Sequence, residues 1–508
     1  MAVETNAQIA TYEQYIDGEW VGSESGATYE VLNPSTEEVI ARVPASGPAD
    51  ARRAIGAARR SFEAGEWRDK PQLKRSEILF RIAEHLAEVS GDWALVESRN
   101  GGSIIRKTSI VDVPLGIQFF RVPAELALQI PWYEPLPWID QPQVAWNFVQ
   151  REPVGVCSLI VPFNFPLMIA LWKLGPALAM GNSVVIKPSP HTPLSLLHAV
   201  RAIDETGLLP SGVLNVVTGA ADELGEELVV NPAVEKVSFT GSTATGRRIG
   251  AAAARGIKRV TLELGGKSAN VVCADADLDL AVDGTLFGIF LHQGQACESG
   301  SIALVHDDVY DEFLARVVER ASALRVGDAT DFDSQVGPLI SRGQYDTVLK
   351  AIERARADGA RVECGGGRAS GVGERGHFIA PTVLSDVRPG AQATTEEIFG
   401  PVLAVQRWFD PTEVIRRVNG SGYGLAGGIW SRDTLHAIEM ARRMRTGTVW
   451  INDWHMLSPE APFGGYRQSG VGREFGIEGL RGYTEVKRIH VDQGVPRDQR
   501  YFYDVLLG

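Results

Sequence analysis

The apolar positions of this chain change their spacing repeatedly between about residue 150 and residue 470. Short and almost continuous apolar runs, such as Val154–Val161, alternate with longer segments whose apolar positions lie three or four apart. The runs are typical of buried parallel strands, and the longer segments are typical of helices that cross over between such strands. Repeated strand–helix–strand units predict a doubly wound α/β sheet up to about residue 263, and a second α/β region from Gly265 to about residue 470.

The same pattern gives approximate bounds for the elements of the first region. Strands are predicted at Val154–Val161, Ser183–Lys187, Val213–Val217, Lys236–Thr240 and Lys258–Glu263. Helices are predicted at about 48–64, 71–99, 167–180, 193–206, 222–229 and 245–255. Short strands with turns are expected over 15–45, where Asp17-Gly18 is a hairpin signal. The aromatic-rich segment Ile130–Gln150 and the tail after Val486 interrupt the alternation.

The composition fits a globular protein and excludes two classes of partner. With 508 residues, of which 44% are hydrophobic and 22% charged, the chain is expected to form two or three domains. The net charge of −13 and the lack of a dense Lys/Arg tract leave no electrostatic footprint for a nucleic acid. No apolar stretch is long enough to span a bilayer, so no membrane association is expected.

Cysteine and histidine usage indicates a reducing compartment and no metal site. Met1–Ala10 lacks the basic and apolar parts of a secretory signal. The four cysteines are widely spaced without a CxxC pair, which favours a cytoplasmic location over a disulfide framework. The nine histidines show neither HExxH nor a Cys/His ligand spacing, so no metal is predicted.

One cysteine lies in a setting that suits a nucleophile. Cys297 lies in the segment Gln293–Gly300, between two glycines that allow a tight turn and a close approach of a ligand to the main chain. A free cysteine is more often a small buried hydrophobe, so this segment alone favours inert packing over a nucleophile.

Two predicted strand ends suit the binding of a phosphate or another ligand. Lys236–Thr240 runs into Gly241-Ser242 and then a helix, whose N-terminal N–H groups and dipole favour phosphate. The spacing is not GxGxxG, and a plain helix cap is the more common role for such a turn. Lys187 ends another strand at the edge where α/β sheets bind ligands, although a solvated charge is about equally expected there.

Two further side chains suit oxyanion binding and acid–base chemistry. Asn164, which lies between two prolines, could donate an N–H to an oxyanion, although a turn asparagine is the simpler role. Glu263 ends a strand, and apolar surroundings would raise its pKa toward that of a general base, while a solvated glutamate is equally consistent. Gly265-Gly266 and the glycine-dense loop Pro462–Gly470 follow, and Glu396–Val402 combines an acidic pair with an aromatic residue and a Gly-Pro turn.

Together, these motifs resemble the aldehyde dehydrogenase superfamily in their order and separations, from about Tyr15 to Lys487. The resemblance implies an NAD(P)-dependent, hydrolytic, non-acylating enzyme whose thiolate nucleophile is Cys297, with a lowered pKa. It implies that Asn164 and the Cys297 N–H form the oxyanion hole. Glu263 would activate the cysteine or the hydrolytic water, and the aldehyde would be oxidised through a thiohemiacetal and a thioester.

For the cofactor, the resemblance implies NAD, with NADP as the alternative. Lys187 would bind the adenosine ribose, Gly241 and Ser242 the pyrophosphate, and Glu397 the nicotinamide ribose. The implied cofactor contacts are Ile160, Val161, Pro162, Phe163, Lys187, Ser189, Pro190, Gly241, Ser242, Leu264, Glu397 and Phe399.

The resemblance also implies an aldehyde dehydrogenase-like α/β fold in three parts. A doubly wound Rossmann-type cofactor domain would take residues 1–125 and 149–262, and an α/β catalytic domain would take 263–470. A small β bridging element at 126–148, with the C-terminal tail at 471–508, would serve oligomerisation. A homodimer or a homotetramer is therefore expected.

Three positions depart from the family pattern in ways that matter. Pro190 stands where NAD-preferring relatives commonly carry a glutamate that holds the ribose hydroxyls, which leaves the choice between NAD and NADP open. Ile302 stands where an arginine is frequent. Glu298 directly follows the nucleophile, and a carboxylate there would raise the thiol pKa unless it points away.

The expected substrate is a small-molecule aldehyde of medium to large size, and the resemblance implies a tunnel lined by Phe165, Ile169, Trp172, Leu291, Leu457 and Phe463. This apolar and partly aromatic lining favours hydrophobic or aromatic aldehydes. Aromatic rings also bind trimethylammonium groups, so a betaine-aldehyde-type substrate is an alternative, as is a semialdehyde. A coenzyme A-acylating enzyme is less expected, because that subgroup generally lacks a glutamate at the position of Glu263. A non-catalytic protein would be expected to have lost Cys297, Glu263 or Asn164.

Overall fold

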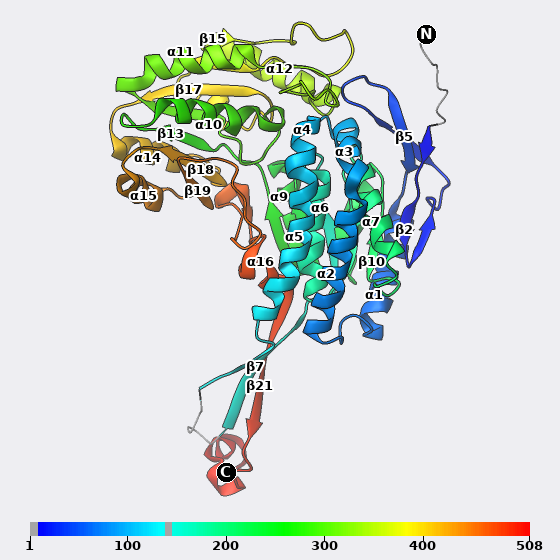
Figure 1. The fold of residues 1–508 in the computed structure, drawn as a ribbon. Helices are drawn as coiled ribbons and strands as arrows, with labels where there is room; N and C mark the ends of the chain where they lie inside the picture. The colour runs from blue at the N-terminus through cyan, green and yellow to red at the C-terminus, as the bar shows by residue number, and fades with distance from the viewer. Residues whose placement is uncertain (1–8, 138–144) are drawn as a thin grey trace.

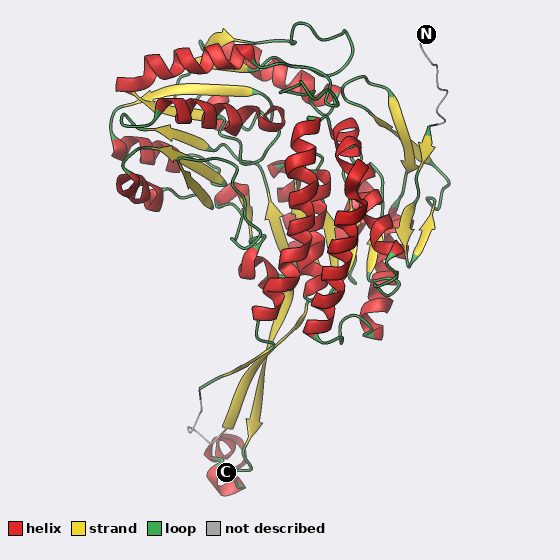
Figure 2. Cartoon of the chain, viewed as in Figure 1, coloured by secondary structure: helices red, strands yellow, loops and turns green. Residues whose placement is uncertain are grey.

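The computed structural model describes residues 9–137 and 145–508. Two α/β bodies lie side by side, and a narrow β arm extends from them toward the C-terminus (Figures 1 and 2). Parts of the predicted cofactor domain and of the predicted bridging element, at 1–8 and 138–144, lie outside the described residues, as does most of Met1–Ala10.

Eight strands form the first sheet, in the order β20-β12-β11-β8-β9-β10-β2-β3. Its parallel strands are β8 (Val156–Ile160), β9 (Ser183–Lys187), β10 (Leu214–Val216), β11 (Lys236–Thr240) and β12 (Arg259–Glu263). Antiparallel strands cover the two edges, namely the hairpin β2 (Gln14–Ile16) and β3 (Glu19–Val21), and β20 (Gly470–Val471). The strand order reverses between β8 and β11, which makes the carboxyl ends of these strands a ligand-binding crevice in sheets of this type.

Helices cover both faces of this sheet, which explains why its strands are apolar on both sides. Val184 and Ile186 of β9 face one core, whereas Val185 between them faces the other, because side chains alternate along a strand. The first core includes α2 (Gln72–Val89), α5 (Val113–Leu126), α6 (Pro166–Ala179) and α7 (Leu194–Glu205). The second includes α1 (Pro48–Ala64), α8 (Asp222–Val230) and α9 (Thr243–Arg255).

The predicted strands of this region are confirmed to within two residues, and so are all its helices except one. The predicted helix at 71–99 is wrong as a single element. It is broken by a 3₁₀ turn at Ser90–Asp92, and α3 (Trp93–Gly101) follows as a separate helix. Serine, glycine and aspartate are weak helix formers, so the break falls where helix propensity is lowest.

Seven strands form the second sheet, in the order β15-β16-β17-β14-β13-β18-β19. These are β13 (Ala269–Val272), β14 (Ile302–His306), β15 (Arg361–Cys364), β16 (Thr382–Ser385), β17 (Val402–Trp408), β18 (Ala426–Trp430) and β19 (Thr448–Ile451). Only β15 is antiparallel to its neighbour. The longer helices of this body are α10 (Leu278–Phe290), α11 (Asp307–Ala323), α12 (Arg342–Ala357), α14 (Pro411–Asn419) and α15 (Thr434–Arg443). The predicted second α/β region is therefore confirmed.

The β arm is a three-stranded antiparallel sheet in the order β21-β7-β6. It consists of β6 (Tyr133–Pro135), β7 (Ala145–Pro153) and β21 (Thr484–Asp492). Figure 1 shows that the arm projects away from both α/β bodies and ends in short C-terminal helices. A small separate sheet, β1 (Ala10–Thr11), β5 (Val39–Pro44) and β4 (Thr28–Leu32), lies near the N-terminus.

Candidate active site

The carboxyl ends of the parallel strands place several predicted site residues in one row. Ile160 of β8 is in register with Lys187 of β9 and with Phe239 of β11. One residue further along, Thr240 of β11 is in register with Glu263 of β12. The residues that end these strands, or directly follow them, therefore share one edge of the sheet.

The helix N-terminus after β11 has the features of a phosphate site and of an ordinary cap. Ser242 is the N-cap of α9, and its Oγ accepts a hydrogen bond from the Thr245 N–H at 3.2 Å. A side chain at Gly246 would lie 2.3 Å from Leu264 Cδ2, so a larger residue here would displace the Leu264 side chain that packs against α9. Leu264 itself is held by a hydrogen bond from its N–H to Ser469 O at 2.9 Å.

Lys187 is buried at the end of β9 rather than solvated. Its Nζ donates to Pro188 O at 3.3 Å, and burial lowers its pKa to about 8. The Val161 N–H donates to Lys187 O at 3.0 Å, which joins this strand end to the segment Val161–Phe163. Pro190 is partly exposed and offers no donor or acceptor side chain.

The two glycines after Glu263 let three segments meet. The Gly266 N–H donates to Glu397 Oε1 at 3.1 Å, and a side chain at Gly265 would lie 2.1 Å from Glu397 Oε2. A side chain at Gly266 would lie 2.3 Å from Cys297 O. Glycine therefore allows both Glu397 and the Cys297 backbone to approach this turn closely. Burial raises the pKa of Glu397 to about 7.

Two aromatic rings predicted at the cofactor site are in contact. Phe163 and Phe399 meet edge to face, with ring centroids 5.7 Å apart. Phe399 has a φ of 56°, a left-handed conformation that is unusual for a bulky residue, and such strained positions are concentrated at functional sites.

Asn164 is tied to the turn that presents Cys297. Its side chain is 3% exposed, and Nδ2 donates to Gln295 O at 2.7 Å. Gln295 is itself buried, and its Oε1 accepts from the Ile340 N–H at 3.1 Å. Among the residues that the structure describes, no acceptor pairs with the Cys297 N–H. The amide of Asn164 and this N–H are therefore both suited to bind an oxyanion.

Glu298 points toward the thiol rather than away from it. The Cys297 thiol donates to Glu298 Oε2 at 3.1 Å, and Glu298 Oε1 lies 2.8 Å from His455 Nδ1. Burial raises the pKa of the Cys297 thiol well above its usual range, and the charge and hydrogen bond of Glu298 raise it further. The expectation of a lowered thiol pKa is wrong, because no cation offsets these effects among the described groups that shift this pKa. The expected effect of Glu298 is confirmed.

Glu263 is a buried carboxyl whose oxygens have no partner within the described chain. It is 2% exposed, and burial and the charge of Glu474 raise its pKa well above the usual range. A side chain at Gly464 would lie 2.6 Å from Glu263 Oε1, so the glycine-dense loop leaves room for the carboxyl. A raised pKa and unsatisfied oxygens suit a group that takes up and releases a proton.

Five of the six predicted tunnel residues belong to, or pack against, the same apolar core as Cys297. Phe165, Ile169, Trp172 and Phe463 are buried in one apolar cluster, against which Leu457 and Cys297 pack. Leu291 is partly exposed and belongs to no such cluster. Two further aromatic rings, which no sequence pattern marked, belong to this group. The ring centroid of Phe475 lies 4.9 Å from that of Trp172 and 5.7 Å from that of Phe463. The ring centroid of Phe119 lies 4.3 Å from that of Phe475.

The sequence patterns also did not predict the buried charged residues near this cluster. Lys107 Nζ lies 4.1 Å from the centre of the Phe165 ring and forms a buried ion pair with Asp112 at 2.6 Å. Lys173 forms another with Glu474, also at 2.6 Å. These residues match no motif, and Glu474 comes from a part of the chain far from Lys173. Only the π-helical insertion at Thr108–Asp112 is a local feature often found near functional sites.

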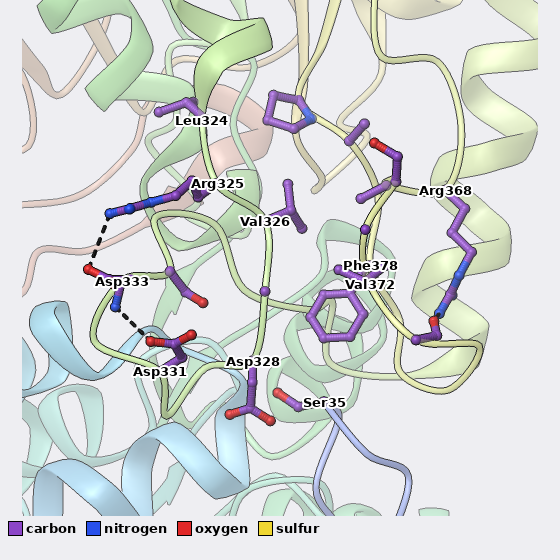
Figure 3. Close-up of a pocket in the computed structure, with 18 of the residues that line it drawn as sticks. Ser35, Leu324, Arg325, Val326, Asp328, Asp331, Asp333, Arg368, Val372 and Phe378 are labelled. Carbon is purple, nitrogen blue, oxygen red and sulfur yellow. Dashed lines mark hydrogen bonds and ion pairs between the residues drawn. The ribbon is translucent and has the colours of Figure 1, made fainter.

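A cavity of about 1030 Å³ lies apart from these residues (Figure 3). It lies between the segment after α11 and the loop around Arg368. Two of its arginines have local partners, since Arg325 pairs with Asp333 at 3.4 Å and Arg368 donates to Gly376 O at 2.7 Å. None of the predicted site residues lines it.

Residues 9–137 and 145–508 contain neither a candidate metal site nor a helix that could span a membrane. No group of histidine, cysteine and acidic side chains in this part of the chain could hold a metal ion. Its helices include none with the length and apolar character needed to cross a bilayer.

The sequence is similar to known proteins over nearly its whole length. It matches the sequence model of the aldehyde dehydrogenase family over residues 20–489. Betaine aldehyde dehydrogenase of Bacillus subtilis (strain 168) is 41% identical over 479 residues, which cover 94% of this chain and 96% of that protein. Retinal dehydrogenase 2 of Homo sapiens is 41% identical over 490 residues, which cover 96% of this chain and 93% of that protein.

Solved structures show the same fold. An NAD+ complex of an aldehyde dehydrogenase from Bacillus cereus superposes with a TM-score of 0.92 at 38% identity, covering 97% of this chain and 99% of that one. Betaine aldehyde dehydrogenase from Staphylococcus aureus, in complex with NAD+, gives a TM-score of 0.92 at 37% identity and covers 95% of each chain. The predicted α/β fold with a doubly wound sheet is confirmed.

Proposed function

This chain belongs to the aldehyde dehydrogenase family, and we propose that it oxidises a hydrophobic or aromatic aldehyde to the carboxylic acid through a covalent bond to Cys297. The observation that supports this site most directly is the 2.7 Å hydrogen bond from Asn164 Nδ2 to Gln295 O. It fixes the amide beside the turn that presents the nucleophile. An amide nitrogen has two hydrogens, so the second remains for an oxyanion.

In the first half of the proposed reaction, the Cys297 sulfur adds to the aldehyde carbon. The carbonyl oxygen becomes an oxyanion, to which Asn164 and the Cys297 N–H donate hydrogen bonds. A nicotinamide cofactor, when bound, supplies the acceptor for the hydride that leaves this carbon, and a thioester remains on Cys297.

In the second half, Glu263 takes a proton from water as the water oxygen attacks the thioester. Its burial beside Glu474 supports this role, because a carboxyl with a raised pKa can take up a proton near neutral pH. The carbon–sulfur bond breaks, and the acid is released. Hydrolysis is favoured over transfer to coenzyme A, since Glu263 is present and buried at this place.

The described residues fit a dinucleotide at the carboxyl edge of the first sheet. The N-terminus of α9 would bind the pyrophosphate, Lys187 the adenosine ribose and Glu397 the nicotinamide ribose. Phe163 and Phe399 would lie against the nicotinamide end, and the remaining predicted contacts line the strand ends between these groups. NAD is the proposed cofactor, supported by relatives solved with NAD+. NADP is the alternative, because Pro190 supplies no carboxylate to repel a 2′-phosphate.

The aromatic cluster supports a hydrophobic or aromatic substrate. Trp172, Phe463 and Phe475 would surround such an aldehyde beside Cys297. A betaine-aldehyde-type substrate is the second candidate, supported by the similarity to betaine aldehyde dehydrogenase. The Lys107 ammonium already lies at the face of Phe165, so this ring is not available to a trimethylammonium group, which favours the neutral substrate.

The proposed domain division has a cofactor domain at 1–125 and 149–262, a catalytic domain at 263–470, and bridging parts at 126–148 and 471–508. The two separate sheets and the arm support a division into three parts, while the proposed boundaries fall inside β7, β12 and β20. The arm supports a homodimer or homotetramer, because Tyr133, Trp146 and Val486 on it are exposed. The four cysteines are all unpaired, which supports the reducing conditions of a cytoplasmic location.

An aldehyde panel run separately with NAD+ and NADP+ tests the function. Benzaldehyde and hexanal should give reduced cofactor and the matching acid faster than betaine aldehyde or succinic semialdehyde. Cys297→Ala should abolish both products. A preference for the acidic semialdehyde would refute the substrate proposal, and full activity of Cys297→Ala would refute the mechanism.

A matched variant separates the two halves of the reaction. Glu263→Gln should slow acid release by about 10²–10⁴-fold, while a thioester accumulates on Cys297 and is detected by mass spectrometry of the intact protein. Unchanged turnover would show that Glu263 is not the base.

A further inference from the structure

Cys297, Glu298 and His455 form a continuous chain of hydrogen bonds. The thiol donates to Glu298 Oε2 at 3.1 Å, and Glu298 Oε1 lies 2.8 Å from His455 Nδ1. On its other side, His455 Nε2 lies 3.2 Å from Gly288 O. The side chains of His455 and Glu298 are only 5% and 6% exposed, so the chain is shielded from solvent.

The carbonyl of Gly288 determines where the protons of His455 lie. A carbonyl can only accept, so Nε2 carries a hydrogen. Nδ1 of a neutral imidazole would then present a lone pair to an ionised carboxylate, which is repulsive at 2.8 Å. An imidazolium paired with an ionised Glu298 satisfies every contact. Burial opposes ionisation of Glu298, but the hydrogen bond and charge of His455 outweigh it and lower the Glu298 pKa.

The other acidic groups that shift the thiol pKa accept no hydrogen bond from the thiol in the described part of the chain. Glu263 and Glu397 act on Cys297 through their charges, which raise the pKa of the thiol. No hydrogen bond joins either of them to the sulfur in the described part of the chain, and the Glu263 oxygens have no partner there. The rings of Phe287, Trp450 and Trp454 surround His455, with centroids 5.4, 6.5 and 6.4 Å away.

We propose that Glu298 is a catalytic base of this enzyme, which accepts the Cys297 thiol proton through Oε2 as the sulfur attacks the aldehyde. His455 is the positioning residue that orients this carboxylate and keeps it ionised. The inference rests on the proposed aldehyde oxidation and divides its proton transfers between two carboxyls. Glu298 serves the cysteine, and Glu263 serves the water.

The step balances without another reactant. The sulfur–carbon bond forms as the S–H bond breaks, the carbonyl π pair moves to the oxygen that Asn164 binds, and the proton goes to Glu298 Oε2. During hydrolysis, the carbon–sulfur bond breaks and the leaving sulfur takes this proton back. Glu263 takes the proton from water and then releases it to solvent, which accounts for the net proton of the oxidation. The thiol is therefore protonated again before the next turnover.

Two measurements on Glu298→Gln test this, because the proposal makes them change in opposite directions. The first is the single-turnover rate of reduced-cofactor formation with a good aldehyde, which should fall about 10²-fold, the usual contribution of a general base. The second is alkylation of Cys297 by iodoacetamide without cofactor, followed on its own peptide by mass spectrometry. It should become about tenfold faster at neutral pH, because loss of a neighbouring negative charge lowers the thiol pKa.

Two matched variants complete the experiment. His455→Asn retains a donor near Nδ1 but cannot carry a charge, so it should slow the single turnover less than Glu298→Gln and shift its acid limb to higher pH. Glu263→Gln should leave the first-turnover rate nearly intact and slow acid release instead.

The outcomes are distinct. Unchanged single-turnover and alkylation rates in Glu298→Gln would overturn the proposal, and a fall in both would indicate only a disturbed loop and overturn it too. If wild-type protein reduced no cofactor with any aldehyde, the proposed function itself would fail. A wild type that is active, with an equally active Glu298→Gln, would refute only the role of Glu298.

Discussion

The buried ion pair between Lys173 and Glu474 supports a prediction that links folding to the proposed base. Lys173 Nζ lies 2.6 Å from Glu474 Oε1, and the side chains are 0% and 1% exposed. Ser238 Oγ accepts from Lys173 Nζ at 2.8 Å and donates to Glu474 at 3.0 Å. Lys173→Met keeps the length of the side chain and removes its charge, so a buried carboxylate loses its cation.

The expected loss of unfolding free energy follows from the burial of both partners. Removing one partner of a buried pair costs about 3–5 kcal/mol, because the remaining charge is desolvated and uncompensated. Lys173→Met should reduce the free energy of unfolding by about this amount. Lys173 also lowers the pKa of Glu263, so its loss should raise that pKa further. A smaller fraction of Glu263 is then ionised at a given pH, and the acid limb of acid release moves to higher pH.

Denaturant unfolding of wild type and variants measures the first effect, and the pH dependence of acid release measures the second. Lys74→Met is the matched control, since Lys74 and Glu77 also lie 2.7 Å apart but are 62% and 47% exposed. It should cost less than about 1 kcal/mol. The double variant Lys173→Met, Glu474→Leu should regain most of the lost stability. Equal costs for Lys173→Met and Lys74→Met would refute the reasoning from burial.

Three further predictions concern single residues. Gly464→Ala should slow acid release, because its Cβ would lie 2.6 Å from Glu263 Oε1, whereas Gly22→Ala, with no atom within 4 Å, should have no effect. Burial raises the pKa of Glu97 to about 7, above its value in the unfolded chain, so stability falls as pH rises toward 7. Glu97→Gln should therefore be more stable than wild type at pH 8, by up to about 3 kcal/mol, and this gain in denaturant unfolding should disappear near pH 4. Pro190→Glu should reduce kcat/KM with NADP+ far more than with NAD+, and equal changes would contradict the proposed place of the adenosine ribose.

Much of the fold could be predicted because its elements have local signals. The strands β8 and β9 are nearly continuous apolar runs, and helices on both faces of the sheet require such runs. The one wrong helix depended on a weak local signal, since Ser90-Gly91-Asp92 interrupts an otherwise periodic pattern. Strand ends such as Lys187 and Glu263 could be identified as candidates because parallel strands end at the same edge of a sheet.

The candidate site could be predicted only where the contact partners are near in the chain or belong to a motif. Glu298 directly follows Cys297, so its effect on the thiol pKa could be expected from the sequence. Only the orientation of its side chain, toward the thiol or away from it, was undecided. His455 lies 157 residues away from Glu298, and Glu474 lies 301 residues away from Lys173. Phe475 likewise joins Trp172 and Phe463 without any pattern that marks it.

The sequence by itself determined the order of the candidate site groups along this chain, namely an amide, a lysine, a glycine turn, a carboxyl and a cysteine. Each of them follows a recognisable element. Only the tertiary structure decided the charge states of these groups. A pKa depends on burial and on charges within a few ångströms, and both are set by segments far apart in the sequence. The raised pKa of the Cys297 thiol, the lowered pKa of Glu298 beside His455 and the raised pKa of Glu263 are therefore properties of the fold.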